Sequence, residues 1–457
     1  MFANKIEKPG THRPVIIPPS EVHSVLSSHM LADGFAIVFD LEKSHGTYVY
    51  DSRTNRTLLD YFTFFASGAL GMNHPKLREP AFVEKLGKIA VNKTSNSDAY
   101  TVEMAEFVET FARIAQPSYL PYAFFIDGGT LGNENALKTA FDWKVQKNFK
   151  KGYSREVGLQ VIHFRNAFHG RSGYTLSLTN TDPVKIRHFP KFSWPRIHNP
   201  ILTFPLTEEH LEKVKKEEEL AIRQIQQAIV DNPDDIAALI IEPIQGEGGD
   251  NFFRKEFFVS LRTICSENDI MFIIDEVQTG VGMTGKMWAH EYYAEPDMMS
   301  FGKKMQVCGF VCSKRVDEVP ENVFQVPSRI NSTFGGNLVD MVRAARMLEI
   351  IQEERLVENA QACGSYLLEQ LTTLENEFPS LISNARGLGL FCAIDIDSKD
   401  RREILKTKAY DNGLILIGCG ERTVRFRPPL NISKAEIDEG ISIIRRCLKE
   451  IANDGVH

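Results

Sequence analysis

Residues 271–280 read MFIIDEVQTG, and the four apolar residues from Met271 to Ile274 run directly into the carboxylates of Asp275 and Glu276. A short apolar run of this kind is typical of a strand that is buried on both faces of a parallel sheet. Because α/β proteins bind ligands at the carboxyl ends of such strands, we expect Asp275 at a ligand site. A buried carboxylate there needs a positively charged partner.

Similar short apolar runs recur along the chain, separated by longer amphipathic segments. This alternation of apolar runs and amphipathic segments predicts an α/β fold with a mostly parallel central sheet that is covered by helices. The predicted buried strands are Ala123 to Ile126, Val157 to Phe164, Ala237 to Ile241, Met271 to Ile274, Met298 to Phe301 and Cys308 to Cys312. Thr207 to Asp231 has the charged face of a helix on the surface of the protein.

A different pattern begins at Asn337, where apolar residues recur at the spacing of a long helix. Further on we expect strands at Leu388 to Ile394 and at Leu414 to Ile417. An amphipathic helix is expected from Ser433 to Ile451.

The chain has 457 residues, and single hydrophobic cores stop growing at roughly 250–300 residues. We therefore expect two compact units. The larger one covers residues 75–336, and a smaller α+β domain is built from both chain ends, residues 1–74 and 337–457.

Charge and composition exclude several classes of protein. The net charge is −7 and the basic residues are scattered, so no nucleic-acid partner is expected. Met1 to Gly10 lacks the apolar core of a signal peptide, and no apolar run approaches the ~20 residues of a membrane helix. Seven cysteines, with no second ligand pair beside Cys308 and Cys312, favour reduced thiols in a cytoplasmic protein over a metal site.

A candidate anion site follows the first predicted strand of the large unit. Gly128 and Gly129 lead into a helix that is expected to continue to about Lys151. Glycines let the backbone approach a phosphate closely, and free N–H groups at a helix start favour negative charge. Thr130 can cap this helix or donate its hydroxyl, but an ordinary glycine turn with a threonine N-cap would have the same sequence.

Two further strand ends carry candidate site residues. Phe168 and His169 precede a glycine turn, where an aromatic ring can stack on a planar cofactor, although such a residue is more often part of a core. Lys303 follows the strand that ends at Phe301, where apolar surroundings can lower a lysine pKa and allow a Schiff base to form. The alternative is a solvated lysine, and Lys304 is a rival for the same role. Side chains alternate along an extended strand end, so the two lysines are expected to point to opposite sides.

Gly280 to Gly285 spells a literal GxGxxG, the pattern of dinucleotide-binding proteins. We discount it because no clear glycine-led helix and no suitably placed ribose carboxylate accompany it.

Taken together, these segments resemble the class III aminotransferases in order and spacing, from about residue 20 to the end of the chain. The strings are the glycine–threonine turn, Phe168-His169-Gly170, Glu242-Pro243-Ile244-Gln245-Gly246-Glu247-Gly248-Gly249, Asp275-Glu276-Val277-Gln278-Thr279-Gly280, Phe301-Gly302-Lys303, Thr333, and Val424-Arg425-Phe426-Arg427. The resemblance implies fold type I of the pyridoxal 5′-phosphate enzymes. It also implies a homodimer with active sites at the subunit interface.

Residue roles follow from that resemblance. Lys303 would hold the cofactor and act as the base, and Asp275 would pair with the pyridine nitrogen. The other implied cofactor contacts are the phosphate ligands Gly129 and Thr130, the ring neighbours Phe168, His169 and Val277, Gln278 at the phenolic oxygen, and Thr333 from the second subunit. The implied substrate contacts are Arg171, Glu247, Arg425 and Asn331.

Within the family, the strings around Asn135, Trp143, Met305 and Asn331 resemble the subgroup that acts on the ε-amino group of L-lysine with 2-oxoglutarate. This subgroup has alanine where the chain has Thr130. The products would be L-glutamate and L-2-aminoadipate 6-semialdehyde, which cyclises to 1-piperideine-6-carboxylate. The alternatives are ornithine or 4-aminobutyrate as donor, a pyridoxal-phosphate aminomutase, or a binding protein without activity.

Overall fold

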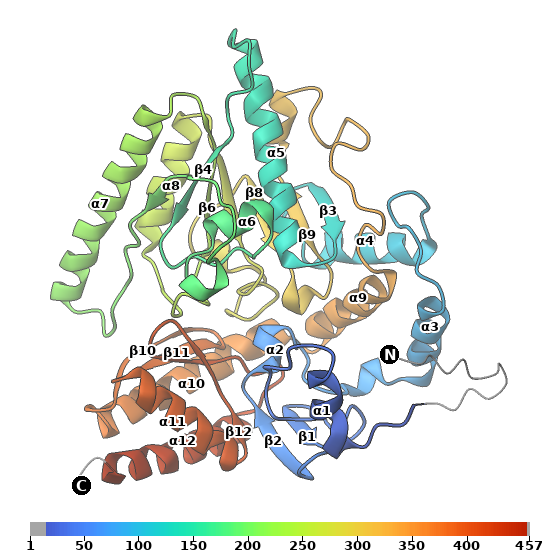
Figure 1. Cartoon of the computed structure of the whole chain (residues 1–457), viewed down its shortest axis with the longest axis vertical. Helices are drawn as coiled ribbons and strands as arrows, with labels where there is room; N and C mark the ends of the chain where they lie inside the picture. Colours follow the sequence, from blue (N-terminus) through green and yellow to red (C-terminus); the bar gives the residue numbers. More distant parts are fainter. Residues whose placement is uncertain (1–14, 455–457) are drawn as a thin grey trace, which may run out of the picture.

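The seven-stranded sheet in the upper half of Figure 1 contains all the predicted strands of the large unit. The computed structural model describes residues 15–454, so the segment Met1 to Gly10 lies outside the described residues. The strand order is β3-β9-β8-β7-β6-β4-β5. The strands are β3 (Tyr122–Ile126), β4 (Gln160–Phe164), β5 (Arg196–Ile197), β6 (Ile236–Ile241), β7 (Met271–Asp275), β8 (Met298–Phe301) and β9 (Cys308–Cys312).

The sheet is mostly parallel, as predicted, and only β9 among these strands runs against its two neighbours. The predicted strand from Val157 is wrong at its start, because β4 begins at Gln160. Gly158 has a φ of +116°, and its N–H donates a 2.6 Å hydrogen bond to the Asp235 carboxylate. This turn prevents Val157 from joining the sheet.

Helices cover both faces of the sheet because neighbouring strand residues point to opposite sides. In β6, Ala238 and Ile240 pack with the face covered by α5 (Gly129–Lys150). Leu239 and Ile241 pack on the opposite face against α7 (Glu208–Asp231) and α8 (Lys255–Glu267).

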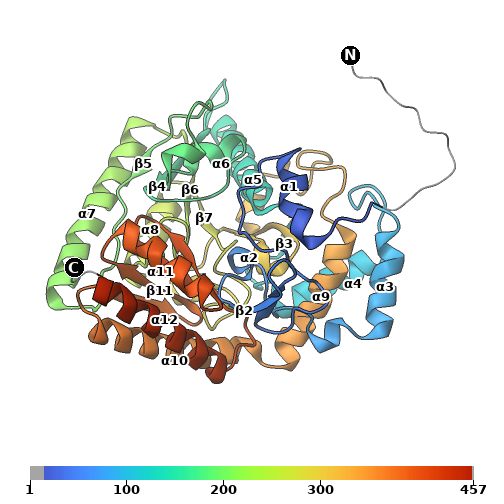
Figure 2. The ribbon, with the colours of Figure 1, turned by 60° about the horizontal axis from the view of Figure 1, so that its bottom comes forward.

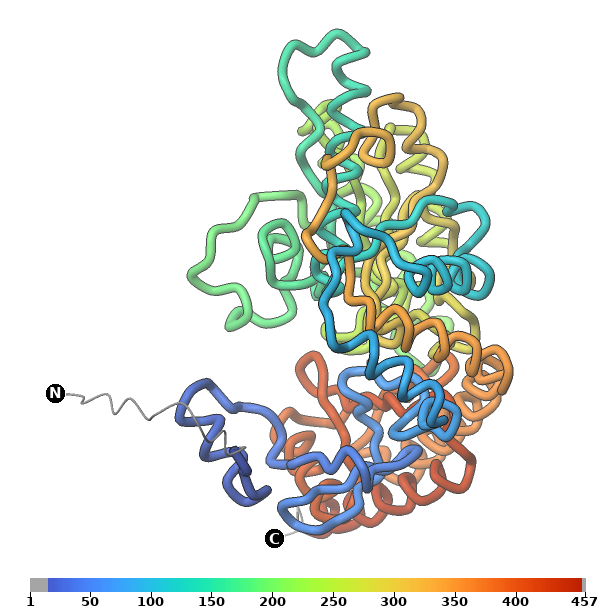
Figure 3. The backbone as a smooth tube through the Cα atoms, turned by 90° about the vertical axis from the view of Figure 1, so that its right-hand side faces the viewer, coloured from blue at the N-terminus to red at the C-terminus, as the bar shows by residue number. Residues whose placement is uncertain are grey.

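Two smaller sheets form the lower half of Figure 1, and they bring the chain ends together. One has the order β1-β2-β12, and the other has the order β10-β11-β14-β13. Their strands are β1 (Tyr48–Asp51), β2 (Arg56–Asp60), β10 (Ile382–Leu388), β11 (Phe391–Ile396), β12 (Leu414–Ile415), β13 (Ile417–Cys419) and β14 (Thr423–Phe426). Figure 3 shows the N-terminal and C-terminal segments side by side below the large sheet.

Two strand predictions in this lower half are wrong. The predicted strand Leu388 to Ile394 is a hairpin of β10 and β11, because the chain reverses at Gly389, whose φ is +54°. The predicted strand Leu414 to Ile417 divides into β12, which pairs with β2, and β13, which pairs with β14 in the other sheet.

Helices α10 (Leu356–Glu377), α11 (Lys399–Asp411) and α12 (Lys434–Asp454) lie together beside β11 (Figure 2). The predicted helix after Asn337 is α9 (Leu338–Glu353), and the Asn337 side chain caps it by accepting from Val339 N. The remaining helices are α1 (Val22–Ser27), α2 (Thr63–Ala66), α3 (Pro80–Ala90), α4 (Val102–Ile114) and α6 (Gly173–Leu178), with 3₁₀ turns at Pro19–Glu21, Pro75–Leu77, Pro183–Lys185, Ala289–Tyr292, Lys303–Met305 and Lys314–Glu318. Within residues 15–454, no helix is both long and apolar enough to cross a membrane.

The short element α2 winds with the opposite hand to a normal helix, because φ is positive at all four of its residues, from +40° at Thr63 to +67° at Ala66. Left-handed backbone costs non-glycine residues roughly 1–2 kcal/mol each. The buried Asp60 carboxylate accepts from the N–H groups of Phe62 and Thr63 at 2.8 and 2.9 Å. These bonds hold the turn at the junction between the large and small sheets.

Candidate active site

A cavity of about 530 Å³ lies at the carboxyl edge of the large sheet, and we call it the strand-end pocket. The parallel strands β3, β4, β6, β7 and β8 all end at this edge. The pocket brings together nine of the predicted site residues: Gly129, Thr130, Phe168, His169, Arg171, Asp275, Val277, Gln278 and Lys303. It also contains Asn133 and Cys308, for which the sequence suggested no role.

Asp275 ends β7 and is 5% exposed. Its carboxylate accepts from Asn133 Nδ2 at 2.7 Å and from Val277 N at 3.0 Å, and it lies 2.8 Å from His169 Nδ1. Burial opposes ionisation of Asp275, but the contact with His169 and these hydrogen bonds outweigh it, so the pKa of the carboxyl lies below its usual value. Asp275 is therefore an anion that is ready to hold a cationic ring nitrogen.

Lys303 begins the 3₁₀ turn after β8 with a φ of +50°, and its side chain lines the strand-end pocket. Burial, together with the nearby charge of Arg425, lowers the pKa of Lys303 to about 8. An amine with this pKa is neutral in a useful fraction of molecules near neutral pH, so it can act as a nucleophile or a base.

Lys304 points away from the pocket. Its buried Nζ donates to the carbonyl oxygens of Ala66 and Gln278 at 3.0 and 2.9 Å. The expected alternation of the two side chains along an extended strand end is wrong, because both lysines lie in a 3₁₀ turn.

The N-terminus of α5 enters the pocket at Gly129 and Thr130. The first N–H groups of a helix have no partner within it, and no side chain caps α5. The prediction that Thr130 caps the helix is wrong, because Gly128 is the N-cap and Thr130 Oγ1 accepts from Arg171 N at 3.2 Å. The free N–H groups leave room for an anion such as a phosphate.

Phe168 and Val277 also face this pocket. Phe168 N donates to Glu242 Oε1 at 3.0 Å, which fixes the backbone of the aromatic residue. Burial raises the pKa of Glu242 to about 7. A methyl group on Gly129 would lie 2.8 Å from Val277 Cγ1, so only glycine fits between the helix start and this side chain.

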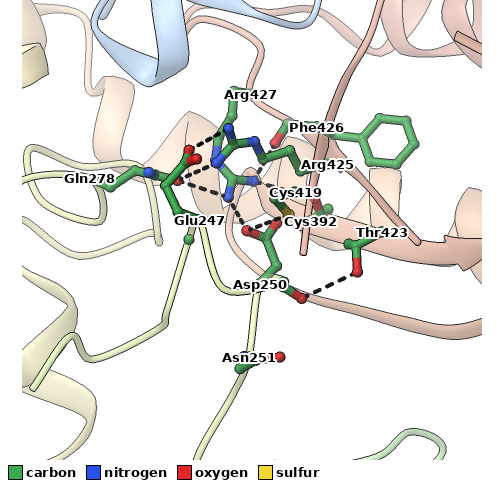
Figure 4. A network of polar contacts seen from close by, with 12 residues as sticks. Glu247, Asp250, Asn251, Gln278, Cys392, Cys419, Thr423, Arg425, Phe426 and Arg427 are labelled. Atoms are coloured by element: carbon green, nitrogen blue, oxygen red, sulfur yellow. Dashed lines mark hydrogen bonds and ion pairs between the residues drawn. The ribbon is translucent and has the colours of Figure 1, made fainter. Parts of the chain in front are cut away.

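Arg425 and Glu247 form an ion pair next to the pocket (Figure 4), with 2.6 Å between Nη2 and Oε1. Arg425 is 1% exposed, and its Nη1 lies 3.4 Å from Gln278 Oε1. The ring of Phe65, presented by the left-handed turn α2, lies 5.5 Å from the Arg425 guanidinium. Glu247 thus balances the charge of Arg425, which lies beside Gln278 of the strand-end pocket.

A second buried pair, Arg427 and Asp250, lies beside the first at 2.6 Å, and Arg427 Nη2 donates to Gln278 Oε1 at 3.2 Å. Sequence reasoning missed this pair, as it missed Asn133 and Phe65. The sequence signals for Arg427 were its place in the string Val424-Arg425-Phe426-Arg427 and its position two residues after Arg425, which puts both side chains on the same side of an extended chain.

Four predicted residues do not line the pocket: Glu247 and Arg425 lie beside it, whereas Asn331 and Thr333 are not brought to it. Asn331 and Thr333 are exposed. Asn331 Oδ1 accepts from Ser332 N at 2.8 Å, and the Thr333 carbonyl accepts from Ser95 Oγ at 2.5 Å. The contribution of Thr333 to the site of a second subunit stays a prediction, as does the substrate contact of Asn331.

The residues present fit pyridoxal 5′-phosphate. Within residues 15–454, no hydrogen bond or ion pair occupies the Lys303 amine in the pocket. An ionised carboxylate, a free amine of lowered pKa and an uncapped helix start therefore surround one cavity. They match the three polar ends of the cofactor, namely the pyridine nitrogen, the carbonyl carbon and the phosphate.

Comparison with known proteins gives one consistent family. The model of the aminotransferase class III family matches residues 31–448. The L-lysine-epsilon aminotransferase of Mycobacterium tuberculosis is 50% identical over 432 residues, which are 94% of this chain and 96% of that protein. The protein of the same name from Streptomyces clavuligerus is 46% identical over 435 residues, covering 94% and 95% of the two chains.

A solved structure agrees with the sequence comparisons. The lysine aminotransferase from M. tuberculosis in the internal aldimine form superposes with a TM-score of 0.93 at 50% identity, over 95% of this chain and all of that one. The protein therefore belongs to the class III aminotransferases, which are pyridoxal-phosphate enzymes of fold type I.

Proposed function

We propose that the protein transfers the ε-amino group of L-lysine to 2-oxoglutarate. The products are L-glutamate and L-2-aminoadipate 6-semialdehyde, which cyclises to 1-piperideine-6-carboxylate. The observation that carries the proposal is the Glu247–Arg425 ion pair beside Lys303. The names of the relatives at 46 to 50% identity support lysine as the donor.

Pyridoxal 5′-phosphate, when bound, supplies an electron sink for the reacting carbon. We assign Lys303 to hold the cofactor and to move the proton at the reacting carbon of the substrate. Asp275 would keep a proton on the ring nitrogen, because a carboxylate of low pKa stabilises the charged ring. Phe168 and Val277 would confine the ring, with Gln278 at its phenolic oxygen. Gly129 and Thr130 would bind the phosphate.

The ion pair explains how one pocket can accept two unlike substrates. L-Lysine reacts at a carbon without a carboxylate, whereas glutamate reacts at a carbon that bears one. A buried Arg425 without a partner would be costly in the lysine complex, so Glu247 neutralises it there. In the glutamate complex, Arg425 would bind the α-carboxylate and Glu247 would move away. Arg171 would hold the distal carboxylate of either substrate, and Asn331 would add a further substrate contact.

Stopped-flow measurement of each half-reaction tests this function. Glu247→Ala should impair the lysine half-reaction more than the glutamate half-reaction, because Arg425 would then stay unpaired when lysine binds. Arg425→Ala should do the reverse. Equal losses in both halves for both variants would mean that the pair only supports the fold.

The same measurement separates the alternative donors. One methylene in a pocket discriminates only about 1–3 kcal/mol, so ornithine and 4-aminobutyrate must be compared with lysine directly. If the cofactor absorption band decreases faster with ornithine or 4-aminobutyrate than with lysine, that amino acid is the donor. Turnover without 2-oxoglutarate would indicate an aminomutase, and the absence of any spectral change would indicate a binding protein.

We also propose a homodimer with shared active sites that works in the cytoplasm. Phe65, Leu131 and Phe334 are exposed apolar side chains, and a second subunit would bury such residues. The seven free cysteines support a reducing compartment. We keep the division into a large domain, residues 75–336, and a small domain from residues 1–74 and 337–457.

A further inference from the structure

Glu247 has two cationic partners, one on each carboxylate oxygen. Oε1 binds the buried Arg425 at 2.6 Å, and Oε2 binds Lys185 Nζ at 3.1 Å. The Arg425 side chain is 1% exposed, whereas the Lys185 side chain is 27% exposed. The carboxylate thus joins a cation beside the strand-end pocket to a cation near the protein surface.

Lys185 is held in place by its own segment. It ends the 3₁₀ turn Pro183–Lys185, in which the Asp182 side chain accepts from Val184 N at 2.9 Å. The Lys185 Nζ also lies 5.2 Å from the centre of the Phe168 ring, which lines the strand-end pocket. The ammonium is therefore anchored at the edge of the active site by its turn, by Glu247 and by an aromatic face.

Space exists on the Lys185 side of Glu247. A second cavity of about 550 Å³, which we call the outer cleft, is lined by Lys185, Glu247, Gly248, Lys399, Arg402 and Cys419, among others. Arg402 lies 2.7 Å from Glu403, so this cation already has a carboxylate partner. Among the cations that line the cleft in the described part of the chain, only Lys185 contacts Glu247.

We propose that Lys185 is the positioning residue that receives the Glu247 carboxylate when Arg425 binds the α-carboxylate of 2-oxoglutarate or glutamate. This inference rests on the proposed function. Separation of Glu247 from Arg425 without another cation would leave a largely desolvated carboxylate unpaired, which is strongly unfavourable. Because Lys185 already contacts Glu247, the carboxylate keeps this cation when it leaves Arg425 and never loses its charge partner.

The role predicts an asymmetric defect in Lys185→Met. Glu247 would then stay on Arg425, so the dicarboxylate substrate would lose its binding site, while lysine would still find the closed pair. We expect the 2-oxoglutarate half-reaction to need about tenfold more substrate, the effect of one hydrogen bond to a charged group. The lysine half-reaction should stay close to that of the wild-type enzyme.

The experiment compares three holoenzyme variants in both half-reactions and in calorimetric binding of glutarate, a dicarboxylate that cannot react. Lys185→Met should weaken glutarate binding about tenfold, by the same hydrogen-bond argument. Lys185→Arg should restore it because the charge is kept. Lys399→Met is the matched control, because Lys399 is a cation of the same outer cleft that does not contact Glu247. This variant should bind glutarate normally.

Two outcomes separate failure of this inference from failure of the proposed function. The role of Lys185 would be overturned if Lys185→Met bound glutarate normally, or if Lys399→Met weakened glutarate binding as much as Lys185→Met does. The proposed function would still stand in that case if Glu247→Ala affected the two half-reactions unequally. Equal losses in both halves for Glu247→Ala would overturn the exchange itself. In the Glu247→Ala background, Lys185→Met should add no further loss, and an additional loss would also overturn the inference.

Discussion

Lys303 and Lys304 are adjacent in the chain, yet they have opposite surroundings. The amine of Lys303 faces the strand-end pocket, while that of Lys304 is buried against two backbone carbonyls. Burial lowers the pKa of both groups. Only Lys303 combines a lowered pKa with access to a ligand, so burial alone does not identify a catalytic lysine.

We expect Lys303→Ala to abolish the absorption band of covalently bound cofactor, whereas Lys304→Ala should keep the band. Lys304→Ala leaves the carbonyls of Ala66 and Gln278 without their donor. Its stability should therefore fall by about 1–3 kcal/mol per unpaired group, seen as a lower Tm. Spectra and thermal unfolding of both variants check this. A band in Lys303→Ala that is lost in Lys304→Ala would reverse the assignment.

The pKa of Lys303 sets a pH dependence for cofactor attachment. The amine must be neutral to bond with the cofactor carbonyl, so attachment to the apoenzyme should accelerate as the pH rises and level off above about 8. An ordinary lysine, with a pKa of 10.5, would show no plateau there. Because unfolding lets Lys303 take up a proton between about 8 and 10.5, the stability of the apoenzyme should gain from a rise in pH through this window.

At the scale of elements, the start of α5 gives a test with a matched control. Gly129→Ala places a methyl group 2.8 Å from Val277 Cγ1 at the proposed phosphate site, so both cofactor affinity and Tm should fall. Gly87 lies inside α3 with nothing within 4 Å of a new methyl group. Gly87→Ala should raise stability by up to about 1 kcal/mol and leave cofactor affinity unchanged. Equal affinities for both variants would remove Gly129 from the phosphate site.

The presence of strands could be predicted from the sequence, because apolar runs such as Met298 to Phe301 are bounded by polar residues and glycines. The pairing of the strands could not be predicted. Leu414 and Ile417 are two parts of one apolar run, and they separate only because β2 pairs with β12 while β14 pairs with β13. A local pattern does not contain the position of those distant partners.

The candidate site also has a part that could be predicted from the sequence and a part that could not. The residues at strand ends could be predicted, because parallel strands deliver their carboxyl ends to one edge. Asn133 and the Asp250–Arg427 pair could not, since each depends on a partner far away in the chain. The left-handed backbone of α2 was also hidden, because Thr63 to Ala66 contains no glycine to signal it.

At the scale of the whole molecule, the proposed shared site can be tested by mixing subunits. We expect Lys303→Ala and Thr333→Ala chains, each impaired alone, to regain activity when they exchange subunits. A hybrid dimer would have one site with Lys303 from one chain and Thr333 from the other. No gain after verified exchange would place Thr333 outside the partner's site.

The pairing of β2 with β12 also has a consequence for biosynthesis. β2 ends at Asp60, and its parallel partner begins at Leu414, about 350 residues later. At ribosomal rates of roughly 5–20 residues per second, synthesis of β12 follows that of β2 by on the order of 20 to 70 seconds. The large sheet can form on the ribosome during this time, while the nascent N-terminal hairpin keeps an open edge. An open edge of this kind can pair with a strand of another chain, so the N-terminal hairpin is a site of possible aggregation until β12 is made.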